Sequence, residues 1–278
     1  MSSPTAGQAH PYWFEWFVGL DEIIDLLRPD SETESVTLQE SGAKGWDDVV
    51  VRLKNGRFRL YQVKHSRSDD RLTFGDLVVA EHDHSLLGSL FTSWRNFGTA
   101  QDGAHCILHT NRLPSDRHGT SKSGVHRPPL SDFLRWLVPS VSEAKSISEV
   151  VPKVEWEGAW HEWLSAMGEG SEDERMNFLR SFEVRTGQPD SDDMLQRITQ
   201  ELAEIFGVQG SQVASMVDAL HRALRKWTTG GPPITAESLC QVLTLPPHPG
   251  ELAPAPPPPE PFFPGRLPVA ASIECDLL

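Results

Sequence analysis

Two halves of the chain differ in their pattern of hydrophobic and polar residues. In the first half, apolar residues at three- and four-residue steps predict helices, and short apolar runs bounded by turn residues predict strands. The helices are expected at residues 12–27 and 72–97, and the strands at residues 35–40, 48–53, 58–65 and 105–110. This order, α-β-β-β-α-β, predicts an α/β fold.

The second half shows helical periodicity only, interrupted by Gly and Pro. The helical segments are 130–138, 157–167, 172–182, 192–206, 211–227 and 235–243, so we expect an all-helical region. A proline-rich stretch follows and is typical of a stiff polyproline II linker that leads to another domain. The predicted organisation is a leader at 1–9, an α/β core at 10–128, the helical region at 129–245, and a linker and tail at 246–278.

The second and third predicted strands are joined by Asn55-Gly56, a strong hairpin signal. The length of the turn decides which side chains face each other. A two-residue loop would place Asp47 opposite Lys64, whereas a three-residue loop with a left-handed Gly56 places Asp48 across from Gln62. We favour the three-residue loop, because it brings a carboxylate, an amide oxygen and an ammonium group together.

This set of groups suits phosphodiester hydrolysis. Gln62 and Lys64 are two residues apart on one strand and therefore share a face. Asp48 and Gln62 supply the oxygen ligands that Mg²⁺ prefers, and Mn²⁺ is a possible substitute. Lys64 is placed to orient a water molecule and to stabilise developing negative charge. The alternative interpretation is a surface hairpin with solvated aspartates and an exposed lysine.

Composition narrows the class of protein. No apolar run approaches the roughly 20 residues of a membrane span, and a signal-peptide pattern is absent, so we expect a cytoplasmic protein with no membrane partner. The cysteines, Cys106, Cys240 and Cys275, are too few and too far apart for a disulfide framework or a paired-thiolate zinc site. The net charge of −14 is uneven, because residues 1–128 carry 14 basic and 17 acidic residues and the remainder carries 11 and 22. The first half can therefore present a basic face to nucleic acid.

The run from Asp48 through the Asn-Gly turn to Gln62-Val63-Lys64-His65 resembles the PD-(D/E)xK nucleases, the restriction-endonuclease-like superfamily. It is most similar to the Mrr-like branch, in which Gln replaces the acidic residue before x-Lys. One departure is that Asp47 stands where the motif has proline. The segments 86–94 and 107–112 are similar to nuclease effector domains of bacterial antiphage proteins, which are fused to cyclic-oligonucleotide sensors or STAND ATPases.

The resemblance implies a restriction-endonuclease-like αβββαβ core in which Asp48, Gln62 and Lys64 are catalytic. It also implies an additional acidic metal ligand, for which we favour Glu40, with Glu15 as the alternative. Arg67 and Arg112, in loops after the third and fourth strands, are candidate phosphate contacts.

We therefore expect a metal-dependent deoxyribonuclease with little sequence preference that acts on double-stranded DNA in antiphage defence. The resemblance further implies a homo-oligomer, or a sensor domain or partner that activates the enzyme. The alternative is a catalytically silent nucleic-acid-binding or protein-interaction module on the same fold.

Overall fold

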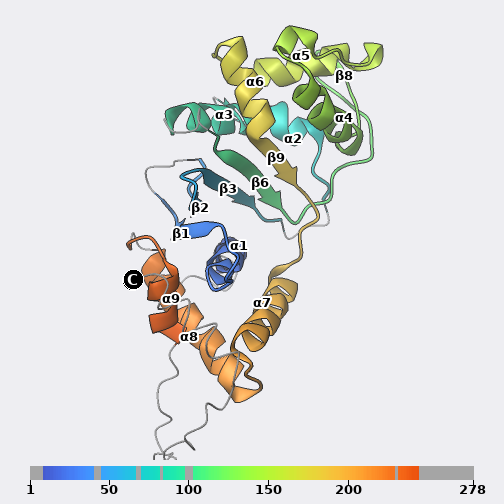
Figure 1. Ribbon diagram of the computed structural model, residues 1–278. Helices are drawn as coiled ribbons and strands as arrows, with labels where there is room; N and C mark the ends of the chain where they lie inside the picture. Colours follow the sequence, from blue (N-terminus) through green and yellow to red (C-terminus); the bar gives the residue numbers. More distant parts are fainter. Residues whose placement is uncertain are drawn as a thin grey trace, which may run out of the picture. The chain divides into compact units, whose positions relative to one another are not determined.

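The computed structural model describes residues 9–40, 45–66, 70–81, 84–97, 103–228 and 231–243. Within these residues the protein is a mixed α/β structure (Figure 1). The main sheet has five strands in the order β1-β2-β3-β6-β9: Thr33–Leu38, Val49–Leu53, Phe58–Lys64, His105–Thr110 and Phe182–Arg185. β6 runs parallel to both β3 and β9, and Gln62 pairs with Leu108 and Lys64 with Thr110. Two small antiparallel pairs are formed by β4 (Ala80–Glu81) with β5 (His84–Ser85) and by β7 (Gly119–Thr120) with β8 (His126–Arg127).

The described α-helices are α1 to α9: Ala9–Asp25, Phe74–Val78, Leu86–Asn96, Leu130–Glu143, Glu157–Ala166, Glu172–Ser181, Ser191–Phe206, Ser211–Trp227 and Ala236–Leu243. Short 3₁₀ turns, η3 and η4, lie at Ile147–Glu149 and Val154–Trp156. Side chains cap several helices: Thr73 and Ser171 form capping boxes with Asp76 and Glu174 at the starts of α2 and α6. No helix among the described residues is long and apolar enough to span a membrane.

The chain divides into two compact units. The first comprises Met1–Glu15, Glu40–Val50 and Arg57–Pro189, and the second comprises Trp16–Gln39, Val51–Gly56 and Asp190–Leu278.

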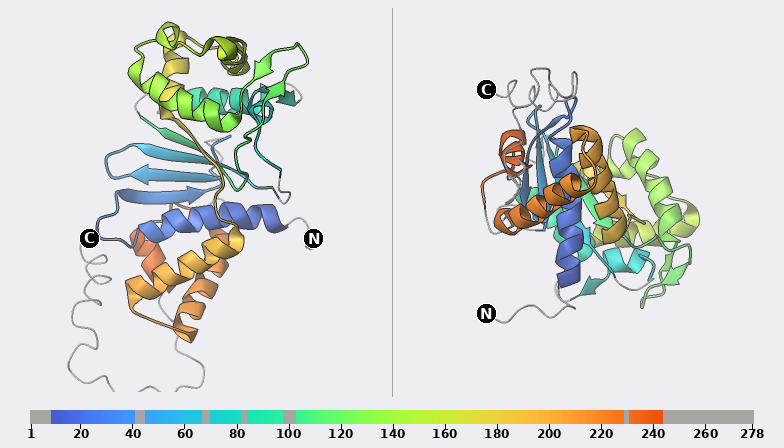
Figure 2. Two further views of the ribbon diagram at one scale, coloured as in Figure 1. Left: turned by 90° about the vertical axis from the view of Figure 1, so that its right-hand side faces the viewer. Right: turned by 90° about the horizontal axis from the view of Figure 1, so that it is seen from below.

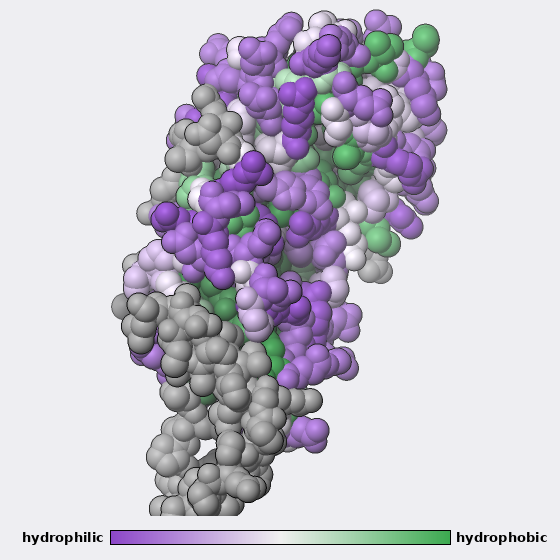
Figure 3. Space-filling view, viewed as in Figure 1, coloured by the Kyte–Doolittle hydropathy of each residue, from purple (hydrophilic) through white to green (hydrophobic). Residues whose placement is uncertain are grey.

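In the first unit, helices α2 to α6 lie on one side of β3, β6 and β9 (Figure 1). Leu60, Cys106 and Leu108 project from the strands into a core that continues through these helices to aromatic residues such as Trp163 and Phe178. Because successive side chains alternate across a strand, Gln62 and Lys64 point to the same side as Leu60. The surface of this unit on the face shown in Figure 3 is predominantly hydrophilic.

The second unit has its own core, in which α8 packs against both α7 and α9. Ile198, Leu220 and Leu239 are fully buried there. Val36 of β1 exchanges backbone hydrogen bonds of 2.9 and 2.7 Å with Ile234. Arg197 forms an ion pair of 2.6 Å with Asp21, which connects α7 to α1.

Most of the predicted elements are confirmed to within a few residues, and the strand at His105–Thr110 is confirmed at both ends. Two predictions were wrong. The single helix expected at 72–97 is two helices, because the Ser85 hydroxyl accepts the Gly88 N–H at 2.9 Å and begins α3 as a new helix. The region expected to be all-helical contains β9, which pairs with β6. The expected leader, apart from residue 9, and the linker and tail at 246–278 lie outside the described residues, as does Arg67.

Candidate functional site

Asp48 and Gln62 lie together, as the three-residue turn predicts. The Gln62 Nε2 donates a hydrogen bond to the Asp48 Oδ2, and the backbone N–H of Val63 donates to the same oxygen at 2.6 Å. Asp48 immediately precedes β2, whereas Gln62 lies within β3. The start of β2 and the body of β3 thus position the Asp48 carboxylate beside the Gln62 side-chain amide.

The turn itself has the predicted conformation. The Gly56 N–H donates to the Leu53 carbonyl at 2.9 Å, which closes a turn over Lys54 and Asn55. Gly56 has φ = +80°, the left-handed conformation that the three-residue loop requires.

Asp47 has different partners from its neighbour. Its Oδ1 accepts the Gly45 N–H at 2.9 Å, and its backbone forms an isolated bridge with Tyr61. Its carbonyl accepts the Glu40 N–H at 2.9 Å. The carboxylate of Asp47 therefore stabilises the loop before β2, while that of Asp48 contacts β3.

Burial is the main influence on the charge of Asp48 and raises its pKa above the usual value. The Val63 N–H, the positive charge of Lys64 and the Gln62 amide act in the opposite direction, and the charge of Asp47 raises the pKa further. The neighbours of this half-buried carboxylate compensate only part of the cost of burying its negative charge, and a bound cation would stabilise that charge further.

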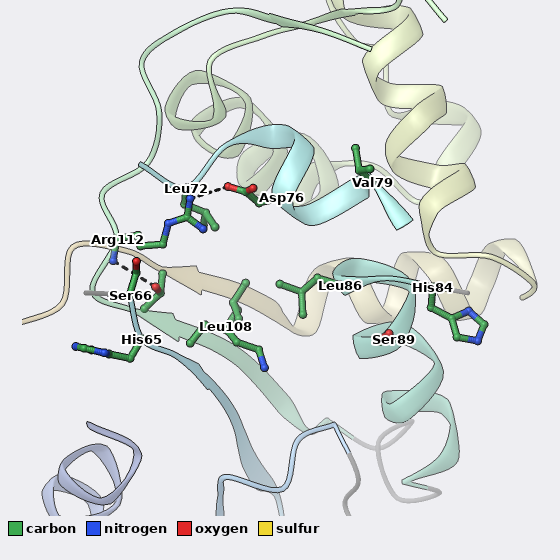
Figure 4. A pocket seen from close by; sticks show the side chains of 12 residues that line it. His65, Ser66, Leu72, Asp76, Val79, His84, Leu86, Ser89, Leu108 and Arg112 are labelled. Carbon is green, nitrogen blue, oxygen red and sulfur yellow. Dashed lines mark hydrogen bonds and ion pairs between the residues drawn. The ribbon is translucent and has the colours of Figure 1, made fainter. Parts of the chain in front are cut away.

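Lys64 is exposed at the end of β3 and lines a cavity of about 570 Å³ (Figure 4). Leu108 and Thr110 of β6 lie on the same face of the sheet and also line the cavity. The ion pair of Arg112 and Asp76 lies at one side, and His84 and Ser89 lie at the other (Figure 4). Lys64 therefore borders a space that can receive a ligand.

The donor atoms suit a hard divalent cation. Asp48 carries a carboxylate, and Gln62 carries an amide whose Nε2 faces Asp48, so its oxygen can share a cation with Asp48 once the amide has rotated. Magnesium binds with few protein ligands because it keeps several waters. Among the described residues, no group of three or more His, Cys, Asp and Glu side chains is arranged to hold a metal ion. The fit to magnesium therefore depends on the carboxylate–amide pair.

The two candidate glutamates differ in position. The hydrogen bond from the Glu40 backbone to Asp47 holds Glu40 close to the loop that carries Asp48. Glu15 follows Phe14, whose ring contacts His65 and His109 at centroid distances of 4.7 and 5.8 Å. His109 lies between Leu108 and Thr110 on β6 and therefore projects from the face opposite to theirs. The choice of Glu40 stays a prediction that this arrangement favours.

Arg112 makes contacts that were not anticipated. Its guanidinium group donates to the carbonyls of Asp70 and Arg71 at 3.0 and 2.6 Å and to the Asp76 carboxylate at 2.9 Å. These bonds attach the loop after β6 to the loop before α2. Arg112 as a phosphate contact stays a prediction, and in this structure the residue holds one wall of the cavity in place.

Asn111 was also missed as a positioning residue. Its side chain accepts the Ser66 N–H at 2.9 Å and donates to the Ser66 carbonyl at 2.7 Å, which ties the end of β3 to the end of β6. No local pattern marks this contact, although Thr73-x-x-Asp76, a capping-box pattern, does mark the start of α2, whose Asp76 pairs with Arg112.

Comparison with protein families and with curated proteins finds no match. Similar solved structures include the Acinetobacter baumannii Cap4 SAVED/CARF-domain containing receptor with the cyclic trinucleotide 3'3'3'-cAAA. The TM-score is 0.46 and the sequence identity is 10%, and the match covers 87% of this chain and 49% of that chain. The Moraxella osloensis Cap4 SAVED/CARF-domain containing receptor has a TM-score of 0.44 and 13% identity over 85% of this chain and 48% of that chain. The chain thus spans about half the length of these receptors.

Proposed function

We propose that the protein is a magnesium-dependent endonuclease that hydrolyses phosphodiester bonds of DNA with little sequence preference. The observation that carries the proposal is the cluster of Asp48, Gln62 and Lys64, in which Asp48 is bonded to the Gln62 amide and lies within the field of Lys64. An oxygen-rich cation site beside an ammonium group is the combination that phosphodiester hydrolysis requires.

Each residue has a distinct role in this proposal. Asp48 and Gln62 hold the cation through their side-chain oxygens. Lys64 orients the attacking water and stabilises the charge that develops on the phosphoryl oxygens. Bound Mg²⁺ supplies further positive charge at the phosphate and lowers the pKa of a water molecule. The cavity beside Lys64 gives the scissile phosphate space to approach.

The role in antiphage defence is part of the same proposal and is supported by the sequence resemblance of residues 86–94 and 107–112 to nuclease effector domains. In such an arrangement, a sensor domain, a partner or self-association brings the nuclease into its active state. If each protomer acts through this one cluster of its described residues, cutting both strands of a duplex is expected to involve two protomers.

A plasmid cleavage assay tests the activity. We expect cleavage with Mg²⁺ or Mn²⁺, no cleavage with excess chelator, and DNA binding without turnover in Ca²⁺, whose looser coordination disturbs the in-line arrangement. Full activity in excess chelator would contradict the metal-dependent mechanism. DNA binding without cleavage under every metal condition would instead support a catalytically silent nucleic-acid-binding module.

The adjacent aspartates provide a matched pair of variants. Asp48→Asn removes the carboxylate next to Gln62, and we expect a rate loss on the order of a hundredfold or more. Asp47→Asn changes a carboxylate that accepts a hydrogen bond from Gly45 within its own loop, and we expect a much smaller loss. Equal losses in the two variants would contradict the assignment of Asp48 as the metal ligand.

A further inference from the structure

The hairpin formed by β7 and β8 is a small, well-defined element of the first unit. Gly119 pairs with Arg127 and Thr120 with His126. The loop between them is closed by hydrogen bonds from the Ser121 N–H to the Val125 carbonyl at 2.9 Å and from the Gly124 N–H to the Ser121 carbonyl at 3.0 Å. The hairpin lies at the edge of the layer of helices α2 to α6, with β8 in contact with α5 (Figure 2, green).

One face of the hairpin is anchored to the helical layer. Arg127 forms a bidentate ion pair with Glu162 of α5, with N–O distances of 2.8 and 2.5 Å, and both side chains are largely buried. Val125 packs beside Gly158 at the start of α5. Bidentate pairs of this kind fix orientation as well as position, so the hairpin is held in one orientation relative to α5.

The opposite face is exposed and carries groups that bind phosphate. His118, Thr120 and His126 alternate with the anchored residues and are all exposed, and the two imidazole rings stack at 4.8 Å. Lys122 is exposed in the loop, and Arg117 is exposed at the base. Residues 117–127 contain no acidic residue, in a chain whose net charge is −14.

The base of the hairpin is continuous with the candidate site. Arg117 lines a hollow of about 490 Å³ together with Arg71, Arg112 and Asp76. Arg112 and Asp76 also line the cavity of Lys64. Asp70 and Asp76 place negative charge in the hollow, but Asp76 is paired with Arg112. The sugar–phosphate backbone of a DNA strand that enters the Lys64 cavity can therefore continue past Arg117 to the exposed face of the hairpin.

We propose that this hairpin is a DNA-binding arm, in which Arg117 and Lys122 contact backbone phosphates of the duplex that flanks the cleavage site. The proposal rests on the nuclease function and adds the surface that holds the substrate. Each phosphate contact releases a counterion, so contacts of this kind make binding salt-dependent without selecting a sequence.

The test is the double variant Arg117→Ala/Lys122→Ala, with Arg135→Ala/Lys145→Ala as a control that removes the same charge from exposed positions of the same unit. Binding of a fluorescent DNA duplex is measured by anisotropy in Ca²⁺ over a range of salt concentrations. We expect the arm variant to lose about tenfold or more in affinity at low salt, and the slope of log K against log salt to become shallower by about 2. The control should bind like the wild type.

Unchanged affinity and slope in the arm variant, or an equal change in the control, would overturn the proposal. Thr120→Glu, which places negative charge on the exposed face and leaves the Arg127–Glu162 anchor intact, should weaken binding by the same route. If the wild-type protein binds DNA through the arm but does not cleave it, the nuclease function is contradicted, whereas the proposal of a DNA-binding arm still holds.

Discussion

At the scale of single residues, the turn between β2 and β3 gives Asp47 and Asp48 different environments. Asp47 bonds to Gly45 within its own loop, whereas Asp48 reaches across to Gln62 and Val63. A shift of one residue in the register would have exchanged the two. The left-handed Gly56 therefore determines which carboxylate is available beside Lys64.

Lys64→Ala is expected to abolish cleavage while leaving the fold and DNA binding largely intact, because the exposed ammonium group acts mainly on the transition state. Lys54→Ala, which removes an exposed lysine from the turn, is the control and should cleave normally. Single-turnover rates with Mg²⁺ and duplex affinity in Ca²⁺ provide the measurement. If the Lys64 variant keeps more than a tenth of the wild-type rate, which corresponds to a loss under about 1.4 kcal/mol, Lys64 is not the catalytic lysine.

At the scale of elements, α3 depends on a close approach to α5. Gly88 is buried, and a Cβ at this position would clash with the backbone carbonyl oxygen of Ala166. Gly88→Ala should therefore destabilise the protein by about 1–3 kcal/mol, the usual effect of overpacking. Ser89→Ala, at the next and exposed position of the helix, is the control. Urea unfolding measures both, and a Gly88 variant as stable as the control would show that the two helices separate easily.

The pairing of β6 with β9 is linked to pH through Glu183. The hydrogen bond with His105 at 3.0 Å and the ion pair with Arg185 at 2.8 Å lower the pKa of Glu183 to about 2. Because the pKa is lower in the folded state than in the unfolded state, this stabilisation is fully present above about pH 4.5 and is lost as the pH falls toward 2.

Glu183→Gln should accordingly be less stable than the wild type at neutral pH, and the difference should shrink as the pH approaches 2. Urea midpoints measured between pH 2 and 7 test this, with Glu155→Gln, at an exposed position, as the control. A difference that stays constant over the whole range would mean that the Glu183 charge does not contribute. Since Glu183 is about 40% exposed, solvent screening keeps the effect modest.

The sequence predicted those parts of the fold that depend on local pattern. The strand at His105–Thr110, the helices of the second half and the turn at Gly56 all carry strong local signals. β9 was missed because it has only four residues and follows a helix directly, so its alternation of apolar and polar residues is too short to indicate a strand. Its strand conformation depends on pairing with β6. The contacts of Arg112 and Asn111 were equally invisible, since they join segments about forty residues apart.

At the scale of the whole molecule, an acidic protein is proposed to bind an acidic polymer. Residues 1–128 are close to neutral, with 14 basic and 17 acidic residues, whereas the remainder has 11 and 22. The local charge of the hairpin and of Lys64 must therefore act against a repulsive long-range field. Such a field extends about 30 Å at 0.01 M salt but only about 8 Å at 0.15 M, so its influence should depend strongly on ionic strength.

Replacing Glu204 and Asp218, two exposed acidic residues of the second unit, with lysine changes the formal net charge from −14 to −10. We expect this double variant to associate with DNA faster than the wild type at low salt, because the long-range repulsion is weaker. The advantage should disappear near 0.15 M salt, and the cleavage rate at saturating DNA should not change, since neither residue belongs to the candidate site. Stopped-flow association rates at the two salt concentrations are the measurement, with Glu204→Gln/Asp218→Asn as the variant of intermediate charge. An acceleration that persists at high salt would indicate that the new lysines contact DNA directly, and no acceleration at low salt would show that only the local charge controls binding.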